Sequence, residues 1–212
     1  FWIWNNFRIK NRYVKALEKA INHRQLNLKN VQFDVTNNHI VQTINNSLNE
    51  DNLHKQIFTI DLIKDLPVDI WKGTLNKILM NGNPEIKMRI IKLALEKKGI
   101  VDESNLLNLS KGTDELAARA LILNNNFTLK RLSNHLHNNL QNNNAHIKAA
   151  SAVCLLQIDK NNKKAKIILE DFLDVKDEKT TALALEYLQI SSELLPKNTL
   201  IALLSHHSIE IS

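Results

Sequence analysis

Glycine, proline and cysteine are scarce in this chain of 212 residues, which contains four glycines, three prolines and one cysteine. Sheet-rich folds and α/β folds with glycine-rich loops need more turn residues than these. Leucine is abundant and valine is scarce, so the surplus of β-branched residues that is typical of strands is missing too. The composition therefore predicts an all-α protein.

The same shortages remove several kinds of functional site. One cysteine cannot form an internal disulfide, and Cys154 lies between Val153 and Leu155, so we interpret it as a buried apolar side chain. The four glycines are scattered and form no phosphate-binding loop. No apolar run approaches the roughly 18 residues that are needed to span a bilayer.

An excess of positive charge is missing from most of the chain, although the formal net charge is +6. Residues 1–30 hold seven cations and one anion, so the remaining residues hold 21 of each sign. A basic body is the usual mark of a protein that binds nucleic acid. The neutral body disfavours that class and directs attention to the first thirty residues.

Asparagine is present in unusual number, with 29 copies and the runs 124–126 and 142–144. Asparagine tolerates the left-handed backbone conformation, so it can replace glycine at helix ends and turns. A genome rich in A/T codons would also raise asparagine, lysine and isoleucine together. We draw no function from this composition.

Two classes of helical segment alternate along the chain, separated by turn residues at regular intervals. Segments with a dense apolar face start at residues 51, 84, 113, 145 and 178, which are 29 to 33 residues apart. They are expected at 51–66, 84–98, 113–123, 145–158 and 178–190, and their partners at 68–80, 103–110, 129–140, 163–173 and 198–204. A two-helix unit that recurs every ~30 residues predicts an α-solenoid.

The dense segments resemble the second helices of HEAT repeats. Pro84–Leu95, Thr113–Leu123 and Ala145–Leu156 each have a polar start, then a basic residue, then small and aliphatic residues. The resemblance covers about residues 35–205 and implies a right-handed solenoid of about five two-helix repeats over residues 31–212. It implies no chemistry of its own.

Residues 1–30 form a separate basic segment that begins with aromatic residues. Aromatic side chains that run into cations are typical of the cytoplasmic end of a transmembrane helix. Because the chain opens within an apolar run and without a methionine, we expect a membrane span immediately before Phe1. The candidate membrane-flank residues are Trp2, Trp4, Phe7, Arg8, Lys10, Arg12 and Tyr13. Two alternatives remain, a cap that packs on the first repeat and an amphipathic surface anchor.

In this context the chain resembles the soluble C-terminal region of bacterial ATP/ADP-translocase-like proteins. The resemblance rests on Tyr13–Leu17, on Asn22–Leu26 and on Phe33-Asp34. It implies a location on the cytoplasmic side of the bacterial inner membrane, with a free cytoplasmic protein as the alternative. No nucleotide-contacting residue is transferred, because the transport domain is not part of this sequence.

Histidine and acidic residues give no candidate metal or catalytic site. His135 and His137 are two positions apart on a predicted helix, so their side chains diverge by about 200° and cannot share a metal. The acidic stretch that contains Glu170 and Asp171 is surrounded by lysines, which indicates a solvated surface rich in ion pairs. We interpret Trp71, Met80 and Met88 as packing residues.

We therefore expect a non-enzymatic solenoid without a cofactor, which binds an unidentified protein partner and touches a membrane surface through residues 1–15. The alternative is a free-standing HEAT-like protein that binds DNA or RNA. Its support comes from local cation excesses at Lys87–Lys98 and Lys160–Lys166, which can also be solvated helix faces or cations that complement the negative ends of helices.

Overall fold

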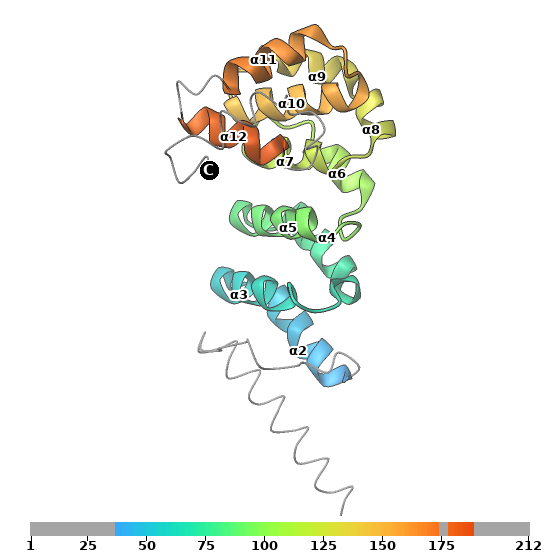
Figure 1. The fold of residues 1–212 in the computed structure, drawn as a ribbon. Helices are drawn as coiled ribbons and strands as arrows, with labels where there is room; N and C mark the ends of the chain where they lie inside the picture. Colours follow the sequence, from blue (N-terminus) through green and yellow to red (C-terminus); the bar gives the residue numbers. More distant parts are fainter. Residues whose placement is uncertain (1–36, 174–177, 189–212) are drawn as a thin grey trace, which may run out of the picture. The chain divides into compact units, whose positions relative to one another are not determined.

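A computed structural model describes residues 37–173 and 178–188, and throughout these ranges the chain forms helices and connecting turns without a strand (Figure 1). The all-α prediction is thus confirmed for the described residues. The chain divides into two compact units, residues 1–102 and 103–212. None of the described helices is long and apolar enough to cross a membrane. All of the membrane-flank candidates, from Trp2 to Tyr13, lie outside the described residues.

In the first unit the described helices are α2 (Asn38–Asn49), α3 (Leu53–Ile63), the 3-10 helix η2 (Val68–Trp71), α4 (Lys72–Asn81) and α5 (Pro84–Glu96). In the second unit they are α6 (Glu103–Leu109), α7 (Glu115–Leu123), α8 (Asn126–Arg131), α9 (Ser133–Asn139), α10 (Ala145–Ile158), α11 (Lys163–Leu173) and α12 (Glu178–Leu188). All five dense segments of the sequence are therefore helices. Of the partner segments, 198–204 lies outside the described residues.

Two partner segments differ from the single helices that the sequence predicts. The segment 68–80 begins as the 3-10 turn η2 after Pro67 and continues as α4. The segment 129–140 starts earlier, at Asn126, and is divided at Leu132, where φ is −88° and ψ is 4°. Apart from Leu136, α9 consists of serine, asparagine and histidine, which are weak helix formers, so little local preference opposes this break.

Asparagine side chains cap the N-termini of several described helices. The amide oxygen of Asn83 accepts a 2.9 Å hydrogen bond from the Glu85 backbone N–H, and Pro84 occupies the first helical position as predicted. Equivalent caps are Asn37 for α2, Asn52 for α3, Asn125 for α8 and Asn144 for α10. These residues have extended backbone with negative φ, so asparagine acts here as a hydrogen-bond acceptor and does not replace glycine in the left-handed region.

The described part of the first unit contains two helix pairs that contact each other. Helix α2 contacts α3, and α4 contacts α5; between the pairs, α2 contacts α4 and α3 contacts α5. The first helices of the two pairs, α2 and α4, thus contact each other, and so do the second helices, α3 and α5. The fully buried Trp71 belongs to the core of this unit, as its interpretation as a packing residue requires. Met80 and Met88 are half-buried.

Helix α10 is the centre of the second unit and contacts α7, α8, α9, α11 and α12 (Figure 1). Every residue from Ala149 to Leu156 is buried, so the helix is covered on all sides. Several of these side chains are small, and small side chains allow helix axes to approach closely. The second helices α7 and α12 both pack on α10.

Polar contacts between neighbouring pairs join residues that are close to one repeat apart. In the first unit, Thr74 Oγ1 donates to Asn45 Oδ1 over 29 positions, and Lys64 Nζ donates to Glu96 Oε1 over 32 positions. Arg89 Nη1 donates to Asp61 Oδ1 over 28 positions. In the second unit, Asn144 Nδ2 donates to the Thr113 carbonyl over 31 positions. The spatial neighbours within each unit thus follow the interval found in the sequence.

Candidate functional site

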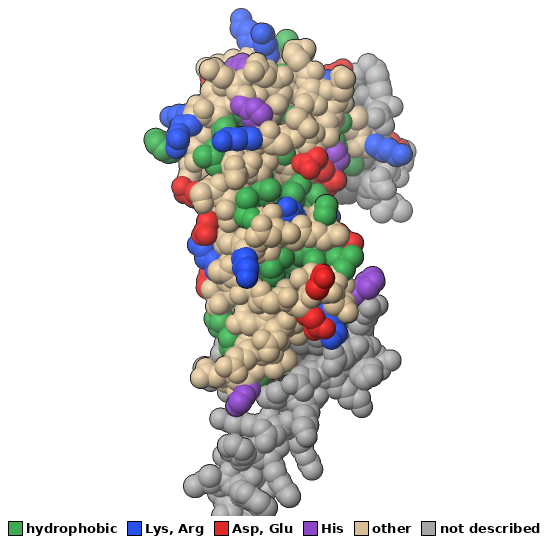
Figure 2. All heavy atoms as spheres, turned by 180° about the vertical axis from the view of Figure 1, so that it is seen from behind, with side chains coloured by type: hydrophobic (Ala, Val, Ile, Leu, Met, Phe, Trp, Pro, Cys, Tyr) green, Lys and Arg blue, Asp and Glu red, His purple; other side chains and the backbone are tan. Residues whose placement is uncertain are grey.

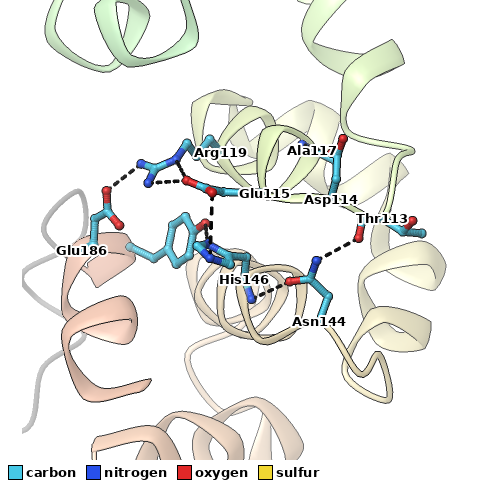
Figure 3. A network of polar contacts seen from close by, with 9 residues as sticks. Thr113, Asp114, Glu115, Ala117, Arg119, Asn144, His146 and Glu186 are labelled. Atoms are coloured by element: carbon cyan, nitrogen blue, oxygen red, sulfur yellow. Dashed lines mark hydrogen bonds and ion pairs between the residues drawn. The ribbon is translucent and has the colours of Figure 1, made fainter. Parts of the chain in front are cut away.

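Five side chains from three helices form a polar cluster in the second unit, here called the Arg119 cluster: Glu115, Arg119, His146, Glu186 and Tyr187 (Figure 3). Helix α7 supplies Glu115 and Arg119, α10 supplies His146, and α12 supplies Glu186 and Tyr187. Figure 3 shows that the Arg119 side chain points toward Glu186 on the neighbouring helix.

Local sequence sets the position of the first two residues. The carboxylate of Asp114 accepts a 2.9 Å hydrogen bond from the Ala117 backbone N–H and so begins α7, one residue after the predicted start at Thr113. Glu115 and Arg119 are then four residues apart on one helix face, where their side chains meet. Arg119 Nε and Nη2 both lie 2.8 Å from Glu115 Oε1.

Arg119 is a buried cation with two carboxylate partners. Its side chain is 6% exposed, whereas those of Glu115 and Glu186 are 39% and 44% exposed. Arg119 Nη1 donates a 2.6 Å hydrogen bond to Glu186 Oε1. Burial by itself lowers the pKa of Arg119, but the hydrogen bonds to Glu186 and Glu115 outweigh it, and the pKa is raised above its usual value. The guanidinium therefore stays charged.

Tyr187 joins the aromatic and charged parts of the cluster. Its ring is nearly fully buried, and the Arg119 guanidinium carbon lies 6.0 Å from the ring centroid, within the range of a cation–π contact. The Tyr187 hydroxyl and His146 Nδ1 are 2.9 Å apart and share a hydrogen bond. Burial is the main reason that the pKa of Tyr187 is raised, so the hydroxyl remains protonated at neutral pH.

The arrangement holds three helices together. Arg119 connects α7 to α12, Tyr187 and His146 connect α12 to α10, and His146 Nε2 lies 4.0 Å from Glu115 Oε2. The buried guanidinium is paired at short range with both carboxylates, so loss of both partners would leave it buried and uncompensated. This is the geometry of a structural clamp across consecutive second helices, with two partly exposed carboxylates at its edge.

The histidines that the sequence drew attention to point to different partners. His135 Nε2 lies 3.2 Å from the Ser110 carbonyl, whereas His137 Nδ1 lies 2.8 Å from the Ser133 carbonyl. Within the described ranges, no group of three or more histidine, cysteine, aspartate or glutamate side chains could hold a metal ion. Cys154 is fully buried as expected, and burial raises the pKa of its thiol.

The two local cation excesses differ in structure. In the first excess, Lys87–Lys98, Lys87 Nζ donates to the Met80 carbonyl and Arg89 pairs with Asp61. The last two lysines of this stretch lie just after the end of α5, where cations complement the negative helix end. In the second, Lys163, Lys164 and Lys166 stand in the first turn of α11, at its positive end, whereas Lys160 lies just after the end of α10. On the face in Figure 2, blue side chains lie at separate places and form no continuous band.

Sequence reasoning missed the most connected polar residues. The Glu115/Arg119 spacing of four is readable, but nothing in the sequence indicates that Glu186 completes the pair. Two buried asparagines were also missed. Asn76 donates to the Lys72 and Ile100 carbonyls and accepts from the Asp102 N–H. Asn124 donates to Ser110 Oγ and to the Ala120 carbonyl.

The described residues thus form helices packed against their neighbours, with a clamp across α7, α10 and α12 in the second unit. Comparison with known proteins found no matching family model, curated protein or solved structure.

Proposed function

We propose that the chain is a non-enzymatic α-solenoid scaffold of HEAT type, with about five two-helix repeats, that binds protein partners or regulates a larger protein. The contacts between residues 28 to 32 positions apart carry this proposal, because they recur in both units at the interval of the sequence repeat. Successive units that bury one another's apolar faces are the physical basis of a solenoid.

The Arg119 cluster supports a scaffold role. Its charged groups are engaged with one another in positions that join helices. In a solenoid, second helices line one surface, and a clamp across α7, α10 and α12 would hold that surface rigid for a partner. Rigid binding surfaces lose less conformational freedom on association, which favours affinity.

Small-angle scattering of the full chain tests the solenoid. A compact globule of this length has a radius of gyration of about 17 Å. A solenoid predicts a clearly larger radius and a pair-distance distribution with a long tail. A radius at the compact value overturns the proposal.

We further propose that the chain is the cytoplasmic region of a transporter-like membrane protein of the bacterial inner membrane and that residues 1–15 lie at the membrane surface. The cluster of aromatic residues and cations in this segment supports the proposal. Flotation with vesicles that contain about one quarter anionic lipid tests it, because each basic residue near such a surface adds roughly 1 kcal/mol of attraction.

The variant Trp2→Ala/Trp4→Ala should reduce recovery with the vesicles, and the exposed Phe127→Ala serves as the matched aromatic control. Equal recovery of the two variants contradicts the membrane-surface role. Sequencing upstream of Phe1 in the gene gives an independent result, since membrane spans there support the transporter context.

Nucleic-acid binding is the second candidate, and the lysines at the start of α11 are the observation that favours it. Binding through phosphates weakens by orders of magnitude when salt rises from about 50 to 200 mM. Titration of the full chain with labelled duplex DNA and single-stranded RNA at these two salt concentrations separates the candidates. The scaffold proposal expects no binding at the lower salt concentration.

A further inference from the structure

Helix α11 presents an outer face with an isolated apolar residue between opposite charges. Ile167 is 64% exposed, which is unusual for isoleucine in a folded helix. Lys163 and Lys164 precede it, Glu170 and Asp171 follow it, and all four are exposed. The opposite face, with Ala165, Leu169 and Leu173, is buried in the unit, where α11 contacts α10 and α12.

The charges on α11 oppose its helix dipole. Anions stabilise the positive N-terminal end of a helix and cations the negative C-terminal end. Four other helices have an acid in the first turn, namely Glu85, Glu103, Glu115 and Glu178, whereas α3, α4 and α10 have a lysine there and no acid. In α11 the lysines occupy the first turn and the acids the last. Lys163, Lys164, Glu170 and Asp171 form no ion pair with the described part of the chain, so no ion pair within the described ranges explains the reversal.

The charge pattern on the outer face of α11 is self-complementary. Residues seven positions apart lie within about 20° of each other around an α-helix. Lys163 and Glu170 therefore share one edge of the outer face, and Lys164 and Asp171 share the other. Ile167 lies at the middle of this face. If a second α11 is laid antiparallel on the first, each lysine meets an acid and each Ile167 meets its counterpart.

We propose that the outer face of α11 pairs with the same face of a second copy of this chain, antiparallel and about a twofold axis at Ile167. Lys163 pairs with Glu170 of the second copy, and Lys164 with Asp171 of the second copy. The twofold axis repeats both pairs, as isologous contacts do. Charged residues at the edges of such a seam select partner and orientation. This inference uses α11 alone and does not depend on the repeat assignment.

The pairing also accounts for the reversed charges. In an antiparallel pair, the first turn of one α11 lies beside the last turn of the other. The lysines then stand next to the negative end of the second copy's helix, and the acids next to its positive end. One helix-to-helix contact buries less surface than a stable dimer requires. The dimer is therefore weak, and it forms at high concentration or where copies are held near one another.

Sedimentation of the full chain at concentrations from about 10 μM to 1 mM tests the pairing, a range that detects weak association. The wild type should shift toward dimer as concentration rises. Both K163E/K164E and E170K/D171K give faces of a single charge sign and should each lower the association constant by about tenfold or more. A one-to-one mixture of the two variants should restore dimerisation, because each face then meets its opposite.

Two controls separate this interface from general charge effects and from misfolding. K97E/K98E makes the same change in net charge as K163E/K164E, but on exposed residues of the first unit, and should leave association unchanged. The fourfold exchange K163E/K164E/E170K/D171K should dimerise with itself again, and it should raise the melting temperature because its charges agree with the helix dipole. Circular dichroism confirms that each variant is folded.

A cysteine at the proposed axis gives an independent test. Ile167→Cys should form a disulfide-linked dimer under mild oxidation much faster than Phe127→Cys, which is also highly exposed. The native Cys154 is buried and does not compete. Equal rates for the two variants, a wild type that stays monomeric to the highest concentration, or a dimer that the charge variants leave intact would each overturn the proposal.

Discussion

Arg119 Nη1 and Glu186 Oε1 are joined by a 2.6 Å hydrogen bond although 67 positions separate the two residues in the sequence. The intervening chain forms α8 to α11 and returns as α12 to lie against α10. Because Arg119 also pairs with Glu115, one buried cation fixes where the last described helix packs. The stability of α12 should therefore depend on this guanidinium.

Arg119→Ala should lower the free energy of unfolding by about 2–3 kcal/mol, because a buried hydrogen-bonded cation is lost while its half-exposed carboxylates can regain water. Urea unfolding followed by circular dichroism measures the change. The matched control is Arg89→Ala, which removes an exposed pair with Asp61 and should cost at most about 1 kcal/mol. Equal losses for the two variants would show that the clamp is not a stabilising feature.

Replacement by alanine should change stability in opposite directions at two glycines of α4, the C-cap Gly82 and Gly73 in the first turn. A Cβ at Gly82 would stand 2.6 Å from the Ile78 carbonyl oxygen, so Gly82→Ala should cost about 1–3 kcal/mol. A Cβ at Gly73, in the first turn of α4, meets no atom within 4 Å. Gly73→Ala should raise stability by about 0.5–1 kcal/mol through its better helix propensity. The two melting temperatures, compared with the wild type, check the sign of each effect.

Asn76 should act as a fixed point for the segment between α5 and α6. Its replacement by alanine leaves the Ile100 carbonyl and the Asp102 N–H without this partner, which should cost about 2–3 kcal/mol. Hydrogen exchange of the Asp102 amide should become faster in the same variant. Asn81→Ala, on the exposed surface of the same helix, is the control and should leave that exchange rate unchanged.

Stability should fall in alkaline solution because of Tyr187. Its folded pKa is raised above the ordinary value of 10.0, so the protein favours the neutral phenol. This contribution is complete below pH 10.0 and is lost as the pH rises above it, by about 1.4 kcal/mol per pH unit. The buried Cys154 thiol, also with a raised pKa, adds a loss of the same sign above its ordinary value of 9.0.

Tyr187→Phe isolates the phenol. At neutral pH it should cost about 1 kcal/mol through the lost hydrogen bond to His146. Above pH 10.0 its free energy of unfolding should decline less steeply than that of the wild type, so that the two curves approach. Curves that remain parallel would contradict the assignment of this loss to Tyr187.

Local signals predicted the helices well because they act over few residues. Asn83-Pro84 marked the start of α5, and Gly99, with a φ of 87°, lies in the left-handed region just after that helix ends, as a stop signal requires. Apolar spacing located all five dense segments. The break at Leu132 was not predictable, since the apolar pattern continues through it and only the weak helix preference of α9 hints at an interruption.

The polar cluster depends on contacts that no local pattern encodes. Glu115 and Arg119 are one turn apart, and their pairing follows from spacing alone. The position of Glu186 beside Arg119 depends on how α7, α10 and α12 pack. Likewise, the sequence predicted a surface rich in ion pairs around Glu170 and Asp171, but α11 places these two acids at the opposite end of the helix from Lys163 and Lys164. Sequence distance is a poor guide to such pairing.

The asparagine caps have a consequence for acid solution. An amide oxygen accepts a hydrogen bond without carrying a charge, and it does not take up a proton when the pH falls through the range in which carboxylates do. The starts of α2, α3, α5, α8 and α10 therefore keep their caps under acid conditions. Asp114, by contrast, caps α7 with a carboxylate, so the start of the helix that carries Arg119 rests on an ionisable group and lacks this independence of pH.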